Sequence, residues 1–467
     1  MTAQTILPAN SVVDTGFATN SCRFDGSTSY MHKTPGSAGN TKLWTWSAWI
    51  KKSLPDGADL GIFGQYIDAN NFFRIRYRSD QRLQVDNYTS GSATFSVILG
   101  SDNEHRDISA WYNLVVAYDS AQGTDSNRVK IYVNGVLQTV FQAATYPSQN
   151  VVTTLPVDGT PIELGRTTDS QFFNGYFAEV VLIDGTALAP TSFGESDSDS
   201  GIWVPIDVSG LTFGTNGFYL DFKNSANLGN DANGGTDLTE VGLAATDQST
   251  DTCTNNFATL NPLDNFYLGG TFSEGNLKLS IDNSAVEAFT TSTIGVSSGK
   301  WYMENKIITT SSGRLYSGVV YGTAQATDDW PGGGSDQWFY RSEDGKVYNG
   351  GSEEYTGATL ADDDIVGIAL DLDNHKLYFS KNGAFQNSGD PTSGATGTGA
   401  IALDTGQTYF FAVGDSGSTA VVSSANFGSP AYAISSGNAD ANDHGNFEYA
   451  VPSGYFALNT KNLAEYG

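Results

Sequence analysis

The chain has 467 residues, enough for two or three domains, and 51 acidic against 23 basic side chains give it a formal net charge of -28 at pH 7. A surface this acidic repels nucleic acid phosphates and anionic lipid headgroups, which argues against nucleic acid as a partner. No apolar run reaches the length of a membrane span, and residues 1–8 lack the basic and apolar parts of a secretion signal. We therefore expect synthesis in a cytoplasm and no membrane insertion.

The composition predicts an all-β fold. Aromatic residues make up 12% of the chain, and 53 glycines stand against only 13 prolines. This balance suits many short strands joined by tight turns, and no long stretch keeps a helical period. The two cysteines, Cys22 and Cys253, lie far apart in the sequence. They are interpreted as two buried thiols, with a single disulfide as the alternative.

The first predicted domain covers residues 21–194 and follows an N-terminal arm of residues 1–20. Its strand over residues 43–50 alternates and places four apolar side chains on one face: Trp44, Trp46, Ala48 and Ile50. A hairpin follows further on. An apolar strand over residues 111–119 ends in an aspartate, and a strand over residues 130–133 closes on Asn134-Gly135. Asn-Gly tolerates positive φ and is a strong hairpin signal.

Residues 195–265 are predicted to connect two domains. They contain one strand, over residues 217–222, and loops rich in asparagine and glycine. Because the segment also carries large aromatic side chains such as Trp203 and Phe257, which need burial, we expect it to pack on the domains rather than to form a free linker.

The second predicted domain covers residues 266–467 and repeats the hairpin of the first. An apolar strand over residues 364–371 ends in an aspartate, and a strand over residues 376–381 closes on Asn382-Gly383. The same design used twice predicts two β-sandwich domains in tandem, with turn signals about every ten residues.

No catalytic residues are predicted. Sandwich enzymes that cut glycans place three carboxylates along one strand as Glu-x-Asp-x-(x)-Glu, and this motif is absent. Glu179 and Asp184 are five residues apart, so strict alternation predicts that they lie on opposite faces. No Gly-x-Ser-x-Gly elbow supports a serine nucleophile. We therefore expect a protein that is not an enzyme.

Two candidate sites for binding are predicted. Sugar rings stack on exposed aromatic side chains, so Trp330 in a glycine-rich loop is the candidate for glycan contact. Its acidic neighbours complete this set: Asp328, Asp329 and Asp336. A calcium site at a sandwich edge is the second candidate, with three ligands: Asp119, Asn134 and Asp184. Solvated turn carboxylates are the alternative to that site, and no other cofactor is expected.

The first domain resembles the laminin-G/concanavalin-like jelly rolls. The resemblance rests on five motifs: Phe24-Asp-Gly-Ser, Trp46-Ser-Ala-Trp49, Trp111-Tyr-Asn-Leu114, Ile131-Tyr-Val-Asn-Gly135 and Gly175-Tyr-Phe-Ala-Glu179. The second domain resembles SPRY domains, which are also concanavalin-like. Its motifs are Gly299-Lys-Trp-Tyr-Met-Glu304, Asp364-Ile-Val-Gly-Ile-Ala-Leu-Asp371, Leu377-Tyr-Phe379, Asn382-Gly383 and Asn426-Phe-Gly428. The resemblance implies two concanavalin-like jelly-roll β-sandwiches in tandem.

The combination, together with joining phrases such as Thr254-Asn-Asn-Phe-Ala-Thr-Leu-Asn-Pro262, is similar to virion structural proteins of marine tailed bacteriophages. That resemblance implies a virion surface protein, a tail fibre or appendage, assembled in the host cytoplasm. Its implied partners are other virion proteins, host surface polysaccharide and further copies of the chain, a trimer among them. The alternatives are a purely architectural capsid decoration or tail adaptor and, third, a glycan depolymerase.

Overall fold

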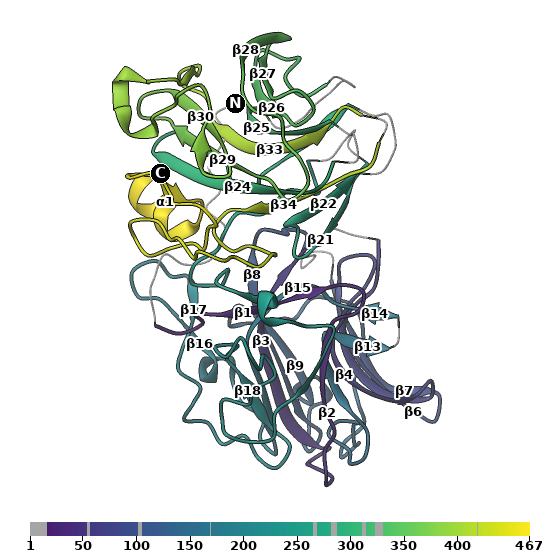
Figure 1. Cartoon of the computed structure of the whole chain (residues 1–467). Coiled ribbons are helices and arrows are strands. Elements are labelled where there is room, and N and C mark those ends of the chain that lie inside the picture. The colour runs from purple at the N-terminus through teal and green to yellow at the C-terminus, as the bar shows by residue number, and fades with distance from the viewer. Residues whose placement is uncertain are drawn as a thin grey trace. The chain divides into compact units, whose positions relative to one another are not determined.

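A computed structural model of the chain describes residues 16–53, 57–100, 105–168, 170–264, 269–281, 287–310, 314–322, 330–417 and 419–467 (Figure 1). The chain divides between Asn255 and Asn256 into two compact units. The regular secondary structure of each unit is almost wholly strand, and the described residues contain a single α-helix, α1 (Thr460–Tyr466). The prediction of an all-β chain with two sandwiches in tandem is confirmed.

The first unit packs two eight-stranded sheets against each other. We call the first the β3 sheet; its strand order is β10 (Val136–Leu137), β9 (Val129–Val133), β8 (Trp111–Asp119), β3 (Leu43–Lys52), β15 (Asn174–Asp184), β1 (Ser21–Asp25) and β20 (Gln248–Ser249), and β18 (Phe218–Leu220) pairs with β15. The second is the β5 sheet, with the order β11 (Phe141–Thr145), β7 (Ser92–Leu99), β6 (Leu83–Thr89), β5 (Asn71–Tyr77), β4 (Leu60–Asp68), β12 (Ile162–Leu164), β2 (Tyr30–Lys33) and β19 (Thr239–Val241). Two short ribbons complete the unit: β13 (Arg166–Thr168) with β14 (Gln171–Phe172), and β16 (Gly194–Ser196) with β17 (Trp203–Pro205).

The core of the first unit lies between these sheets and contains the predicted apolar face of β3. Trp44, Trp46, Ala48 and Ile50 all join it. The Trp44 ring stacks on Tyr118 at a centroid distance of 5.4 Å, and Trp46 stacks on Phe63 at 5.3 Å. The strict alternation of β3 is therefore confirmed, because one face of the strand supplies the aromatic centre of the sandwich.

The other face of the β3 sheet is also buried, under chain segments that flank the sandwich. One apolar cluster there contains Trp49, Trp111 and Cys253, and another contains Phe193 and Tyr219. Both cysteines of the chain are free buried thiols. Of the segment predicted as a connector, residues 195–255 add β18, β19 and β20 to the sheets of the first unit, whereas residues 256–264 belong to the second unit.

A β-bulge at Glu179 breaks the alternation of β15. The pairing of β15 with β3 shifts between Ala178 and Val181, and Glu179 has a φ of 51°. Phe177 faces the core before the bulge and Val180 faces it afterwards, so the parity of the strand reverses. Strict alternation therefore does not hold across Glu179, but the expected opposite faces are found: Glu179 contacts Tyr219 on the outer face, whereas Asp184 follows Val180 and Leu182 on the core face.

Glu179 also clamps the first described residues to the sandwich. Its Oε1 accepts a hydrogen bond from the Ala18 backbone N–H at 3.1 Å, and its Oε2 accepts one from the Tyr219 hydroxyl at 2.5 Å. The side chain is buried, and this burial raises the pKa of Glu179 to about 7, although the hydrogen bond from Tyr219 acts in the opposite direction.

We expect the variant Glu179→Gln to change the pH dependence of stability. The folded pKa lies above the ordinary value of 4.5, so the stability that the neutral form confers is present at low pH and is lost as pH rises through about 7. The variant cannot ionise, so it should match the wild type near pH 4, below the ordinary pKa, and exceed it by about 1–3 kcal/mol at pH 8. Urea unfolding at both pH values measures this. The exposed Glu195→Gln is the matched control, and an equal difference at the two pH values for Glu179→Gln would contradict the assignment.

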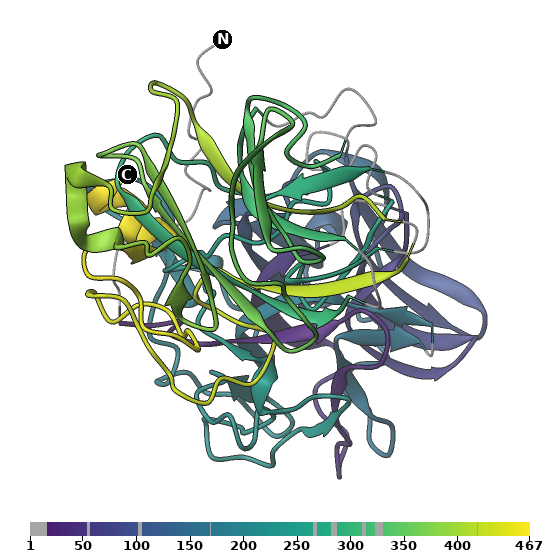
Figure 2. The same cartoon turned by 45° about the horizontal axis from the view of Figure 1, so that its top comes forward.

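The second unit is also a sandwich of two sheets, coloured green to yellow in Figure 2. We call the first the β24 sheet; its order is β21 (Thr271–Ser273), β22 (Lys278–Ile281), β34 (Val421–Asn426), β24 (Lys300–Thr309), β29 (Ile365–Asp371), β30 (Lys376–Lys381) and β31 (Ala384–Phe385), with β32 (Ile401–Ala402) on β30 and β35 (Phe456–Ala457) on β24. The β25 sheet has the order β23 (Ala288–Thr291), β33 (Tyr409–Asp415), β25 (Leu315–Tyr321), β26 (Gln337–Arg341), β27 (Lys346–Asn349) and β28 (Ser352–Thr356). Trp301, Trp338 and Leu463 of α1 share its core.

The two predicted hairpins have the same turn geometry. Asn134 and Gly135 between β9 and β10 have φ values of 48° and 77°. Asn382 and Gly383 between β30 and β31 have φ values of 49° and 79°. Two successive positive φ angles define the type I′ turn that suits a two-residue hairpin, so the Asn-Gly signal is confirmed in both units.

Candidate functional site

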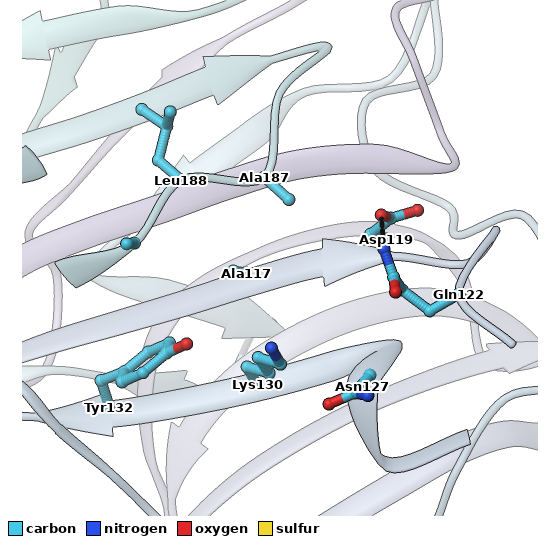
Figure 3. A pocket seen from close by; sticks show the side chains of 9 residues that line it. Ala117, Asp119, Gln122, Asn127, Lys130, Tyr132, Ala187 and Leu188 are labelled. Atoms are coloured by element: carbon cyan, nitrogen blue, oxygen red, sulfur yellow. Dashed lines mark hydrogen bonds between the residues drawn. The ribbon is translucent and has the colours of Figure 1, made fainter. Parts of the chain in front are cut away.

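A polar pocket lies on the face of the β3 sheet that points away from the sandwich core, over the β8–β9 hairpin (Figure 3). Its volume is about 270 Å³. Nine residues line it: Ala117, Asp119, Gln122, Asn127, Lys130, Tyr132, Ala187, Leu188 and Ala189. Figure 3 shows Tyr132, Lys130 and Asn127 in succession along β9 and the turn before it, with Asp119 and Gln122 at the end of β8.

Strand register forms the floor of this pocket. Thr45 of β3 pairs with Ala117 of β8, and Ala117 pairs with Lys130 of β9, so the three side chains form a row on one face of the sheet. The small methyl group of Ala117 leaves open space in the middle of that row. The Thr45 hydroxyl donates to the Thr186 carbonyl at 2.8 Å and accepts from the Leu188 N–H at 2.8 Å. This double contact fixes the 186–189 segment as one wall of the pocket.

The opposite rim is held by Arg128. This buried guanidinium donates to the carbonyl groups of Gln122, Gly123 and Pro147 at 2.7–2.9 Å. The turn that carries Gln122 is thereby ordered, and the Gln122 amide donates to an Asp119 carboxylate oxygen at 2.5 Å. The Asn127 side chain ends the rim and belongs to the last residue of the 3₁₀ turn η2 (Asp125–Asn127).

Lys130 supplies the positive charge of the pocket. Its side chain is half-buried, and its ammonium group forms no ion pair or hydrogen bond with any residue that the structure describes. Beside it, Tyr132 packs its ring against the apolar cluster that contains Val115 and Phe193. Burial raises the pKa of Tyr132, so its hydroxyl stays neutral at pH 7. The pocket thus offers an ammonium donor, amide groups and a carboxylate, with one aromatic ring at its end (Figure 3).

The three residues predicted as calcium ligands are not brought together. Asp119 ends β8 beside Arg128, whereas Asn134 lies at the other end of the same hairpin, where its side chain accepts from the Asn113 N–H at 2.8 Å. Asp184 accepts hydrogen bonds from the Asn40 and Asn216 backbone N–H groups. Within the described part of the chain, no three His, Cys, Asp or Glu side chains form a group that could hold a metal ion.

Trp330, the predicted glycan contact, is half-buried on the β25 sheet. Its ring stands edge to face against Tyr348 at 5.0 Å and lies 6.4 Å from Tyr316. It therefore covers an aromatic cluster on the sheet face opposite the core. Asp336 lies at the start of β26, where its backbone carbonyl accepts from Tyr321 at 3.0 Å. Asp328 and Asp329 lie outside the described residues, so the binding role of this set stays a prediction.

Most of the pocket was missed by the sequence analysis. Only Asp119 had been selected, and for a different reason. Strand alternation does place Lys130 and Tyr132 on one face of the predicted strand over residues 130–133, but it does not show which face of the sheet that is. No local pattern indicates that Leu188, more than fifty residues later in the sequence, crosses over that face.

Each unit contains a segment that matches a protein-family model. Residues 25–191 match the concanavalin A-like lectin/glucanases superfamily, and residues 300–409 match the SPRY domain. The chain carries one domain of each kind. The pocket belongs to the concanavalin A-like domain, and the Trp330 cluster belongs to the SPRY domain. The predicted resemblance to these two families is confirmed. No helix among the described residues has the length and hydropathy of a membrane span.

Several solved structures are similar to parts of the chain. The SPRY domain of human HERC1 is 18% identical with a TM-score of 0.29, over 36% of this chain and 96% of that chain. A putative carbohydrate binding protein from Bacteroides ovatus is 16% identical with a TM-score of 0.32, over 47% and 58%. A SAP-like pentraxin from Limulus polyphemus is 15% identical with a TM-score of 0.28, over 38% and 80%. None of the curated proteins compared with the chain matches it.

Proposed function

We propose that the concanavalin A-like domain is a lectin-like module that binds one sugar ring of a glycan in the β8–β9 pocket. The observation that carries this proposal is that Lys130, Asp119, Gln122, Asn127 and Tyr132 all line one space of about 270 Å³. That volume lies just below the range of about 300–1,000 Å³ for drug-sized ligands, and it suits a single ring.

The chemistry of the lining matches that of a sugar. Sugar hydroxyl groups both donate and accept hydrogen bonds, so they need donors such as Lys130 and Asn127 beside an acceptor such as Asp119. The C–H face of the ring is apolar and packs on aromatic and aliphatic surface, which Tyr132 and Leu188 provide. The match of this domain to a superfamily of lectins and glucanases supports the same substrate class.

We propose that the pocket binds the glycan without cleaving it. Glycoside hydrolysis needs two carboxyl groups on either side of the scissile bond, about 5–10 Å apart. Asp119 is the single carboxylate among the lining residues, and its oxygens already accept from Gln122 and the Ala121 N–H. We therefore infer a protein that is not an enzyme, and the depolymerase alternative would require a second acid that this pocket does not contain.

The biological setting is proposed from the sequence resemblance to virion structural proteins of tailed bacteriophages. In that setting the chain is a virion surface protein, a tail fibre or appendage, and the glycan is host surface polysaccharide. The acidic surface favours this assignment over one with nucleic acid, since a net charge of -28 keeps phosphates away. A capsid decoration or tail adaptor without a ligand is the architectural alternative.

A glycan array with the full chain, followed by calorimetry on the best ligand, tests the proposal. We expect Lys130→Met to weaken that ligand by about 10- to 100-fold, because a hydrogen bond from a charged group contributes about 1.5–3 kcal/mol. Lys223→Met, an exposed lysine of the same domain beside Asp221, should leave the affinity unchanged. If no glycan on the array binds the chain, the architectural alternative is favoured. If both variants bind the ligand with equal affinity, the β8–β9 pocket is not the binding site.

A further inference from the structure

Two segments that pair in the first unit contain no charged residue, although the chain as a whole is strongly acidic. Residues 131–157 contain no Asp, Glu, Lys, Arg or His, whereas 16% of the whole chain is charged. The neighbouring segment 89–100 is also uncharged, and the two meet where β11 pairs with β7. Two uncharged segments therefore lie side by side at one edge of the β5 sheet.

Exposed apolar side chains gather in the first of these segments. The structure describes seven large apolar side chains as exposed. Three of them follow one another where the chain passes from β10 to β11: Val136 at 64%, Leu137 at 43% and Val140 at 49%. We call these three side chains, together with β11, the neutral edge. Single exposed apolar residues are common on protein surfaces, but a group of them in an uncharged region indicates an interaction site.

Among the residues that the structure describes, the neutral edge also contains strand edges with no neighbouring strand. β10 is the last strand of the β3 sheet, and β11 is the last strand of the β5 sheet. Residues 142–145 of β11 are exposed, and the strand contains neither proline nor a charged residue. Proteins normally protect such an edge with lysine, proline or a bulge, because its free N–H and C=O groups pair with other strands. In β11, the feature of this kind that limits pairing with another strand is a single register shift between Phe141 and Ala143.

We propose that the neutral edge binds the same edge of a second copy of this chain. A two-fold axis brings the patch onto its equivalent, so that Val136, Leu137 and Val140 of both copies pack together. The distribution of charge over the surface favours a second copy of the chain as the partner. Two copies each carry a net charge of -28 and repel each other over most of their surfaces, and the neutral edge is a place where they approach without that repulsion.

Other occupants fit this surface less well. A basic partner protein would gain most from the acidic remainder of the surface and least from the neutral edge. A sugar needs polar donors and acceptors, which valine and leucine side chains do not supply. Self-association at the neutral edge is independent of the proposed glycan pocket, since it requires no ligand.

The oligomeric state of the full chain tests the proposal, by sedimentation velocity across a concentration series at low and high salt. We expect a dimer that tightens as salt increases, because screening weakens the repulsion between the acidic surfaces. Leu137→Glu should raise the dissociation constant at least about tenfold, because it buries a carboxylate in the interface. Val140→Glu, on the β11 side of the patch, should act in the same direction.

Ile67→Glu is the matched control. Ile67 belongs to the same unit, is exposed to 44% against 43% for Leu137, and lies beside Asp68 in a charged region. We expect it to leave the dimer intact. A monomer at all concentrations, a Leu137→Glu variant that dimerises like the wild type, or equal weakening by Ile67→Glu would each overturn the proposal. Thermal melting of each variant separates loss of association from loss of folding.

Discussion

Replacing Asp251 with alanine is expected to lower the free energy of unfolding of the first unit by about 3–5 kcal/mol, the usual cost of removing one partner of a buried ion pair. The Lys51 ammonium lies 2.7 Å from Asp251 Oδ2, and the two side chains are 1% and 2% exposed. Asp251 Oδ1 also accepts from the Trp111 indole N–H at 3.1 Å. The substitution removes the carboxylate that balances a buried positive charge and takes the acceptor from a buried indole.

Urea unfolding at neutral pH, followed by the fluorescence of the buried tryptophans, measures this loss. Glu343→Ala is the control, because the Arg314–Glu343 pair has a similar N–O distance of 2.8 Å but both side chains are 44% exposed. Exposed pairs contribute about 0–1 kcal/mol. The double variant Lys51→Met with Asp251→Leu should recover much of the stability, since an apolar pair avoids the desolvation cost of two ions. A loss below about 1 kcal/mol for Asp251→Ala would show that the pair does not anchor the segment to the sheet.

This ion pair also shows which part of the fold the sequence could predict. Trp44 and Trp46 were assigned to the core correctly, because strand alternation is a local property that eight residues are enough to display. Asp251 and Lys51 are separated by 200 positions. The segment around Asp251 is rich in Asn, Thr and Asp without any period, so nothing local indicates that one of its carboxylates is buried against β3.

The candidate site also has one part that the local sequence predicts and another part that depends on long-range contacts. Strand alternation is sufficient to place Lys130 and Tyr132 on one face of β9, because the two positions are two residues apart. The wall of the pocket depends on the contact between Thr45 and residues 186–188, which joins segments more than a hundred residues apart. The bulge at Glu179 is a further example, because one inserted residue reverses the strand parity and no residue type marks it.

Glu304 holds a chain segment against a sheet in the SPRY domain, as Asp251 does in the first unit. We expect its removal to lower the free energy of unfolding by a comparable amount. The side chain lies on β24 and is fully buried. Its Oε2 accepts from the Glu448 backbone N–H at 2.9 Å, and its Oε1 accepts from the Tyr449 N–H at 2.8 Å. Burial raises the pKa of Glu304, while these two backbone hydrogen bonds act in the opposite direction. One carboxyl group thus joins the 448–449 segment to the centre of the β24 sheet.

We expect Glu304→Ala to lower the free energy of unfolding of the second unit by about 2–5 kcal/mol, because two backbone N–H groups lose their acceptor at about 1–3 kcal/mol each. Glu304→Gln keeps one carbonyl acceptor and should lose about half as much. The exposed Glu354→Ala of the same domain is the control and should change stability by less than about 0.5 kcal/mol.

Hydrogen exchange separates a general loss of stability from the loss of this anchor. In Glu304→Ala the amides of Glu448 and Tyr449 should exchange faster than in the wild type by a larger factor than amides in the centre of β29, because the segment opens locally once its acceptor is gone. A uniform acceleration across the SPRY domain would mean that Glu304 acts through core packing alone. Protection that is unchanged at both amides would show that another group holds the segment, and that the carboxylate is dispensable for the fold.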